Sequence, residues 1–329
     1  MSDTPRPLRY QHILQALQEQ PIAITESKLL AIVEFVRFQA QGGKFTAEEV
    51  EERIGAARRP PVRSTGGTAV LPLHGVIAQR MNLMTAVSGG TSSEAFAQDF
   101  RAALDDDAVN SIVIDTHSPG GEVPGTAELA DLIFESRGRK PITAIANPEM
   151  NSAAYWIASQ ADEVVATRGA LVGSIGVVTV HMDASRKLDA EGIEPVIISA
   201  GKYKAEGAAN QPLDADARAH RQEMVDEYYD AFVEAVARGR GVRAAEVRGG
   251  YGEGRVLTAN QALAAGLVDR VGSFEDVLQR HTHGSVRRSG AKADASADDQ
   301  ITTVAESDVD RERVERVAEI ALAGGPSHG

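Results

Sequence analysis

The sequence contains no cysteine among its 329 residues. This absence excludes disulfides, a thiol nucleophile and any metal site built on thiolates. Histidine, aspartate and glutamate also show no spacing typical of metal ligands. We therefore expect a protein that uses neither a metal nor another cofactor.

Long hydrophobic runs are missing as well. No apolar stretch reaches the roughly 18 residues of a membrane span, and the opening MSDTPRPLRYQ lacks the apolar region of a signal peptide. The formal net charge of −13 argues against a surface that binds nucleic acid. We therefore expect a cytoplasmic protein that binds neither membranes nor nucleic acids.

The remaining composition is that of an ordinary globular protein, with 43% hydrophobic and 25% charged residues. From residue 69 onwards, short apolar runs alternate with segments of helical periodicity. The expected strands are residues 69–77, 111–115, 142–146, 163–166, 177–181 and 195–199, and the expected helices include 94–104, 126–135, 184–191 and 215–238. This alternation predicts an α/β fold with a mainly parallel sheet and flanking helices.

The chain divides into four segments by composition. A small helical appendage is expected at the N-terminus, followed by a linker rich in Pro, Gly and Arg. The last segment is polar, too poor in apolar residues to order itself up to about residue 306, and ends in an amphipathic helix. The segments are the appendage 1–56, the linker 57–68, the main domain 69–280 and the tail 281–329.

Ser152 is the first candidate for chemistry. It follows the apolar run 142–146 and the turn Asn147-Pro148-Glu149, and it precedes a helix of small residues. A serine at such a turn lies beside unpaired backbone N–H groups, which suit an attacking oxygen and the oxyanion that it creates. The local sequence also allows a simpler interpretation, in which Ser152 or Asn151 only caps the helix.

A glycine pair upstream could complete an oxyanion site. The segment 117–121, HSPGG, follows a buried strand, and glycines allow close approach of the backbone. Their N–H groups could then point at a developing oxyanion. A glycine pair alone is common in turns, so this pattern needs support from the rest of the site.

The base that would activate Ser152 is less evident. No Ser-His-Asp arrangement is visible, because His74, His117 and His181 lie in or beside strands with no carboxylate partner apparent from the sequence. A lysine that burial keeps neutral can replace histidine as the base. The loop SAGKYKAEG offers two such residues, although most lysines are simply solvated.

Five motifs occur in a fixed order: THSPGGEV, MNSAAYWIAS, LVGSIGVV, SAGKYK and GRVLTANQALAAGLVD. Together they resemble the signal peptide peptidase A (S49) family of serine peptidases, over about residues 69–275. The resemblance implies a ClpP/crotonase-type fold. The short helical N-terminal region and the absence of a membrane anchor resemble the phage branch of the family, the head maturation proteases or minor capsid protein C-like peptidases.

The resemblance assigns roles to individual residues. The nucleophile falls on Ser152, where the usual Ser-Gly-Gly-Tyr is Ser-Ala-Ala-Tyr. The general base falls on Lys204, with Lys202 as the alternative. The oxyanion hole falls on the backbone N–H groups of Gly120 or Gly121 and Ala153. Ser174 matches a serine that orients the lysine, or it is only a turn residue.

The function implied is a serine endopeptidase with a Ser-Lys dyad, which processes scaffold or capsid proteins in the host cytoplasm or the phage prohead. Family members with a single repeat resemble homo-oligomeric rings in which serine and lysine come from neighbouring subunits. Three alternatives stay open on the sequence: a cytoplasmic bacterial S49 peptidase that degrades peptides, a crotonase-like acyl-CoA enzyme, and a catalytically silent structural ring.

Overall fold

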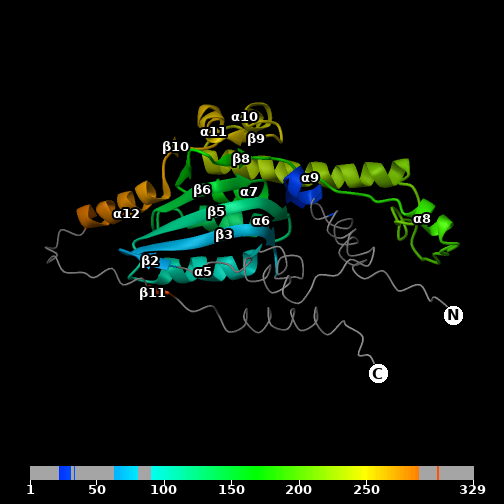
Figure 1. Ribbon diagram of the computed structural model, residues 1–329, viewed down its shortest axis with the longest axis horizontal. Coiled ribbons are helices and arrows are strands. Elements are labelled where there is room, and N and C mark those ends of the chain that lie inside the picture. The colour runs from blue at the N-terminus through cyan, green and yellow to red at the C-terminus, as the bar shows by residue number, and fades with distance from the viewer. Residues whose placement is uncertain (1–21, 31–32, 34–62, 81–89, 289–301, 304–329) are drawn as a thin grey trace, which may run out of the picture.

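The computed structural model describes residues 22–30, 33, 63–80, 90–288 and 302–303 (Figure 1). Its strands are β1 (Ile22–Ile24), β2 (Arg63–Thr65), β3 (Thr68–Ala78), β4 (Gly90–Ser92), β5 (Ser111–Glu122), β6 (Ile142–Asn151), β7 (Glu163–Ala166), β8 (Leu171–Gly173), β9 (Val256–Thr258), β10 (Arg270–Val271) and β11 (Thr302–Thr303). Its helices are α5 (Ser93–Asp105), α6 (Thr126–Glu135), α7 (Ala153–Ala158), α8 (Ser185–Ala190), α9 (Ala215–Arg240), α10 (Ala244–Gly250), α11 (Ala259–Ala265) and α12 (Phe274–Arg288). Within these ranges, no helix combines the length and apolar character that crossing a membrane requires.

The sheet has the strand order β10-β7-β6-β5-β3-β2-β11. Its central pairs, β3 with β5, β5 with β6 and β6 with β7, are all parallel. The strands β2 and β11 extend one edge in antiparallel orientation. The predicted fold class, α/β with a mainly parallel sheet and flanking helices, is confirmed.

Both faces of the sheet are covered, which explains why its strands read as continuous apolar runs. In β5, Ile112 and Ile114 contribute to the large core cluster beside α5, α6 and α7. The intervening Val113 belongs to a smaller cluster on the other face, where Val277 of α12 also packs. Successive β5 side chains therefore serve two different cores, as the alternation of a strand requires.

The helix α9 is anchored to the body through its C-terminal half. Phe232 stacks on Trp156 of α7, with ring centroids 4.6 Å apart and planes 9° from parallel. Gln160 Nε2 donates to the carbonyl oxygen of Ala235 at 2.9 Å. The N-terminal half of α9 continues beyond the sheet to an arm that includes α8 (Figure 1). We define this arm as residues 180–214.

The arm differs from its prediction. Residues 195–199, expected to be a strand, form no strand, while α8 lies close to its expected position. The side chains of Val196 and Ile198 are 80% and 95% exposed. An apolar run of this kind is stable as a strand only when a sheet buries it, and among the described residues no strand pairs with it.

The flanking segments also differ from their predictions. The strand β2 lies inside the predicted linker, β1 lies inside the predicted helical appendage, and β11 lies inside the predicted disordered tail. The helix α12 continues past the predicted boundary at 280 to Arg288. In each case, backbone pairing or packing against the main domain orders a segment whose own composition is uninformative. Most of the appendage and the terminal amphipathic helix lie outside the described residues.

Candidate active site

Ser152 joins the end of β6 to the start of α7, with φ 55° and ψ −121°. It is fully buried and occupies the N-cap position of α7, but its side chain makes no capping hydrogen bond. Its Oγ donates a long hydrogen bond of 3.5 Å to the carbonyl oxygen of Gly176. A positive φ at a residue with a side chain is strained, and such strain is typical of serines held at a strand-to-helix turn.

Backbone hydrogen bonds hold Ser152 in this conformation. Its N–H donates to the carbonyl oxygen of Gly173 at 2.8 Å, and its own carbonyl accepts from Trp156 N at 2.9 Å. The first bond joins the ends of β6 and β8, and the second starts α7. The strained geometry of Ser152 is therefore imposed by the sheet and the helix together.

Gly120 approaches the serine closely, with φ 104°. A Cβ placed on Gly120 would lie 2.8 Å from Ser152 Cβ and 3.1 Å from Ala153 N. The N–H of Gly120 donates to Ser118 Oγ at 3.2 Å. Gly121 lies against β3, where an added Cβ would overlap the backbone of Ile77. The structure thus brings together three of the predicted residues, Ser152, Ala153 and Gly120, and places Gly121 next to them.

Ser174 lies at the same end of the sheet. The strands β6 and β8 are parallel, with Asn151 paired to Gly173, so Ser152 and Ser174 directly follow paired residues. Ser174 also has a positive φ, 56°, and its N–H donates to the carbonyl oxygen of Arg255 at 2.9 Å. Its position beside the nucleophile candidate suits an orienting role as well as a turn.

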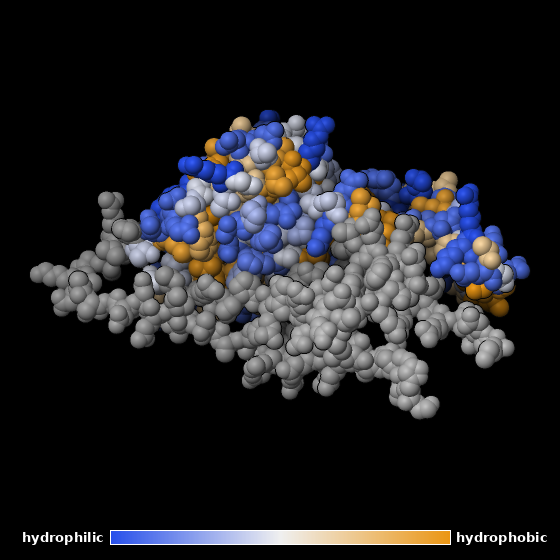
Figure 2. Space-filling view, in the orientation of Figure 1, coloured by the Kyte–Doolittle hydropathy of each residue, from blue (hydrophilic) through white to orange (hydrophobic). Residues whose placement is uncertain are grey.

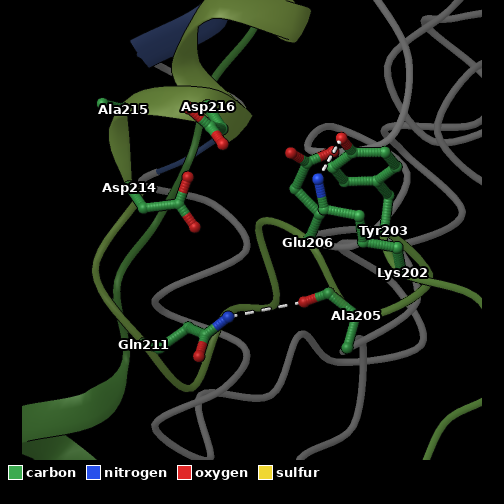
Figure 3. Close-up of a pocket in the computed structure, with 8 residues that line it drawn as sticks. All are labelled: Lys202, Tyr203, Ala205, Glu206, Gln211, Asp214, Ala215 and Asp216. Atoms are coloured by element: carbon green, nitrogen blue, oxygen red, sulfur yellow. Dashed lines mark hydrogen bonds between the residues drawn. The ribbon is translucent and has the colours of Figure 1, made fainter.

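The two candidate lysines lie elsewhere. Both Lys202 and Lys204 are exposed, and Lys202 Nζ donates to Tyr203 Oη at 2.7 Å. Figure 3 shows this loop facing the start of α9 across an open pocket. The lining residues are Lys202, Tyr203, Ala205, Glu206, Gln211, Asp214, Ala215 and Asp216.

The length of α9 separates this pocket from the serine. Asp216 lies in the first turn of α9, whereas Phe232 packs on Trp156, one helical turn after Ser152. The stretch from Asp216 to Phe232 spans roughly 24 Å, at about 1.5 Å per residue. Within one chain, the structure therefore does not bring the lysines to Ser152.

A histidine–carboxylate pair was missed in the sequence. His74 Nε2 lies 3.4 Å from Asp115 Oδ2, a carboxylate partner that was not apparent from the sequence. The pair arises from the register of β3 on β5, which sequence alone does not reveal. Asp115 follows Val113 on the sheet face opposite the α7 cluster. Because of this placement, the pair does not complete a triad with Ser152.

A second missed feature is β1. It pairs with β5 at the glycine pair, directly beside Ser152. A three-residue strand preceded by proline has no periodicity from which it could be predicted.

A buried, strained serine held against a glycine backbone at the end of a parallel sheet is typical of enzymes that catalyse acyl transfer. Residues 135–286 match the model of peptidase family S49. This segment of the chain is therefore similar to peptidase family S49, the family that the sequence motifs resemble.

Two of the proteins to which the chain is similar come from phages. The chain is 30% identical over 245 residues to the head-tail preconnector protein GP5 of Enterobacteria phage P21. This alignment covers 74% of this chain and 48% of that protein. The chain is 31% identical to the capsid assembly protease C of Escherichia phage lambda, covering 64% of this chain and 48% of the relative. The chain therefore spans about half the length of these relatives.

Other similarities are less extensive. The putative signal peptide peptidase SppA of Enterococcus faecium is 28% identical, over 71% of this chain and 66% of that protein. Among solved structures, a mutant of the 1510-N membrane-bound stomatin-specific protease aligns with a TM-score of 0.40 and 16% identity, covering 64% of this chain and 82% of the other.

Proposed function

We propose that this chain is a serine endopeptidase in which Ser152 attacks the peptide carbonyl and Lys204 of a neighbouring copy acts as the base. The observation that carries this proposal is the convergence of Ser152, Ala153 and Gly120 at the end of the sheet. A buried serine whose side chain caps no helix and that lies beside backbone N–H groups suits nucleophilic attack better than a structural role.

The reaction follows from these positions. Lysine Nζ takes the proton of Ser152 Oγ as the oxygen bonds to the carbonyl carbon. The N–H groups of Ala153 and of Gly120 or Gly121 donate to the resulting oxyanion. The lysine then returns its proton to the leaving amine. Water hydrolyses the acyl-enzyme and restores the serine.

The position of the arm supports a lysine supplied by a second copy. Lys204 is exposed and belongs to the arm, which lies beyond the N-terminal end of α9 (Figure 1), and the arm also exposes several apolar side chains. Exposed fractions are 44% for Ile193, 80% for Val196, 50% for Ile197 and 95% for Ile198. Figure 2 shows hydrophobic residues on the arm as orange patches among polar ones.

Apolar side chains exposed together on one segment are typical of a protein interface. If the arm packs on a neighbouring subunit, it buries these residues and carries Lys204 away from its own Ser152. In a closed ring, the arm of each subunit packs on the next subunit in the same way. Ser174, beside the nucleophile, would then orient the incoming lysine. The proposed enzyme is active only as a homo-oligomer.

The substrates follow from the relatives. One is named a capsid assembly protease and another a head-tail preconnector protein. We therefore propose that the natural substrates are scaffold or capsid proteins processed during phage head maturation.

A serine-reactive fluorophosphonate probe tests the assignment. The parent protein should be labelled at Ser152, while Ser152→Ala and Lys204→Ala should not react, because one lacks the nucleophile and the other its base. Lys202→Ala is the matched control from the same loop and should label at close to the parental rate. Parental labelling of Ser152→Ala would overturn the nucleophile, and loss of labelling only in Lys202→Ala would move the base by two residues.

A further inference from the structure

Residues 22–25 of the chain lie in a groove between two backbone walls. On one side, β1 pairs antiparallel with β5, with Ile22 opposite Glu122, Ala23 opposite Gly121 and Ile24 opposite Gly120. On the other side, Ile22 N–H donates to the carbonyl oxygen of Val178 at 2.8 Å. Val178 N–H donates back to Ile22 O at 2.9 Å.

The groove is open to a strand because β6 leaves the sheet early. β5 pairs with β6 as far as Ser118, and beyond this point β1 takes the vacated place beside Gly120 and Gly121. A further bond, from Thr25 N–H to the carbonyl oxygen of Pro119 at 3.0 Å, extends the pairing toward the serine. The segment therefore runs along the groove in the direction of the candidate nucleophile.

The backbone of β1 comes next to Ser152. Both the carbonyl oxygen of Ala23 and the Cβ of Ser152 lie within van der Waals distance of the point where a Cβ on Gly120 would be. The β1 side chains are enclosed, with exposed fractions of 5% for Ile22, 0% for Ala23 and 6% for Ile24. A peptide in this position would present a main-chain carbonyl to the nucleophile and bury its side chains.

We propose that this groove is the substrate-binding site and that residues 22–25 occupy it as an intramolecular competitor. This inference rests on the proposed peptidase function. The ligand is an extended peptide that adds a strand between β5 and Val178 through main-chain hydrogen bonds. The enclosed position of Ala23 selects a small residue there, and the positions of Ile22 and Ile24 select aliphatic residues.

An occupied groove lowers the apparent affinity for any other peptide. The apparent dissociation constant rises as the fraction of molecules with an open groove falls. Variants that release β1 should therefore bind a peptide more tightly than the parent does. This direction is informative because damage to a site normally weakens binding.

The experiment measures binding of a fluorescent peptide with the sequence of residues 20–28, QPIAITESK, by anisotropy. All variants carry Ser152→Ala, so that no peptide is consumed. Ile22→Pro deletes the N–H that donates to Val178, and it should bind the peptide about tenfold more tightly than the Ser152→Ala parent. The matched control is Glu26→Pro, at the first position of a helical turn, where proline is tolerated. It should bind as the parent does.

Two further variants distinguish the release of β1 from misfolding of the protein. Ala23→Asp places a charge at a fully buried position of β1 and should release the segment by a different route. Val178→Pro, added to Ile22→Pro, removes a donor from the groove wall and should abolish the gain in affinity. Thermal unfolding of each variant confirms that the body is folded. If folded Ile22→Pro and Ala23→Asp both bind no more tightly than the parent, the groove proposal is overturned.

The outcome is separable from that of the proposed function, since binding is read without hydrolysis. Tighter binding by the released variants, together with no hydrolysis by the chain with Ser152 intact, would support the groove and overturn the peptidase. Hydrolysis by the chain with Ser152 intact, together with unchanged peptide affinity in the released variants, would do the reverse.

Discussion

Replacing Gly120 with alanine should disable the site through the close approach of its backbone to Ser152. The added Cβ would lie 2.2 Å from the carbonyl oxygen of Ala23 and 2.8 Å from Ser152 Cβ, closer than either atom can approach without displacement. The φ of 104° adds backbone strain of about 1–3 kcal/mol for any residue with a side chain. Overpacking against Ala23 and Ser152 adds about 1–3 kcal/mol. Gly120→Ala should therefore lower the free energy of unfolding by about 2–6 kcal/mol.

Two glycines of the same chain separate strain from overlap. Gly138 has φ 84°, yet a Cβ there would meet nothing within 4 Å. Gly138→Ala should therefore lose only the strain, about 1–2 kcal/mol. Gly169 has open space and no positive φ, so Gly169→Ala should leave the free energy of unfolding unchanged or slightly raise it.

The assay combines urea unfolding with probe labelling. The only tryptophan, Trp156, is fully packed beside the site, so its fluorescence reports unfolding. Gly120→Ala should be the least stable of the three variants, and its folded fraction should react slowly with a fluorophosphonate. If Gly120→Ala is no less stable than Gly138→Ala and labels at the parental rate, the close approach of Gly120 to Ala23 and Ser152 is wrong.

Two further perturbations test the frame of the site. Phe232→Ala removes the ring that stacks on Trp156, so the free energy of unfolding should fall by about 3–5 kcal/mol. Urea titration measures this loss, and an unchanged midpoint would contradict the anchoring of α9. His281 is a test of pH dependence: burial lowers its pKa below the ordinary 6.5, and its Nε2 lies 2.9 Å from Thr143 Oγ1. The pKa of His281 is lower in the folded protein than in the unfolded protein. The neutral imidazole therefore contributes its full stabilisation above about pH 6.5, and this contribution is lost as the pH falls below that value. The difference in melting temperature between the parent and His281→Gln should therefore shrink between pH 7.5 and pH 5, and a constant difference would refute the argument.

The central sheet could be predicted because its strands are buried on both faces. Runs such as 111–115 and 142–146 are apolar at consecutive positions, and helical segments separate them, which leaves few arrangements other than a parallel α/β sheet. The turn motifs could also be located, since only glycine tolerates the approach seen at Gly120. These features depend on residues close together in the sequence and can therefore be predicted from it.

The remaining features depend on partners distant in sequence. Whether Ser152 caps α7 depends on the bond from its N–H to Gly173, which imposes the positive φ. The strand β1 exists because Gly121 and Val178 offer free edges on both sides. The run 195–199 has the composition of a strand but lacks a partner among the described residues, and composition alone gave no sign of this.

The central claim, that serine and lysine come from different subunits, is tested most directly by complementation. Ser152→Ala and Lys204→Ala are each expected to be inactive, and the two are co-expressed and purified as one assembly. Where neighbouring subunits share a site, random mixing restores both groups in about a quarter of the sites, so the mixed assembly should recover up to about a quarter of parental peptidase activity. Activity no higher than that of either variant alone would contradict the account and place both groups within one chain.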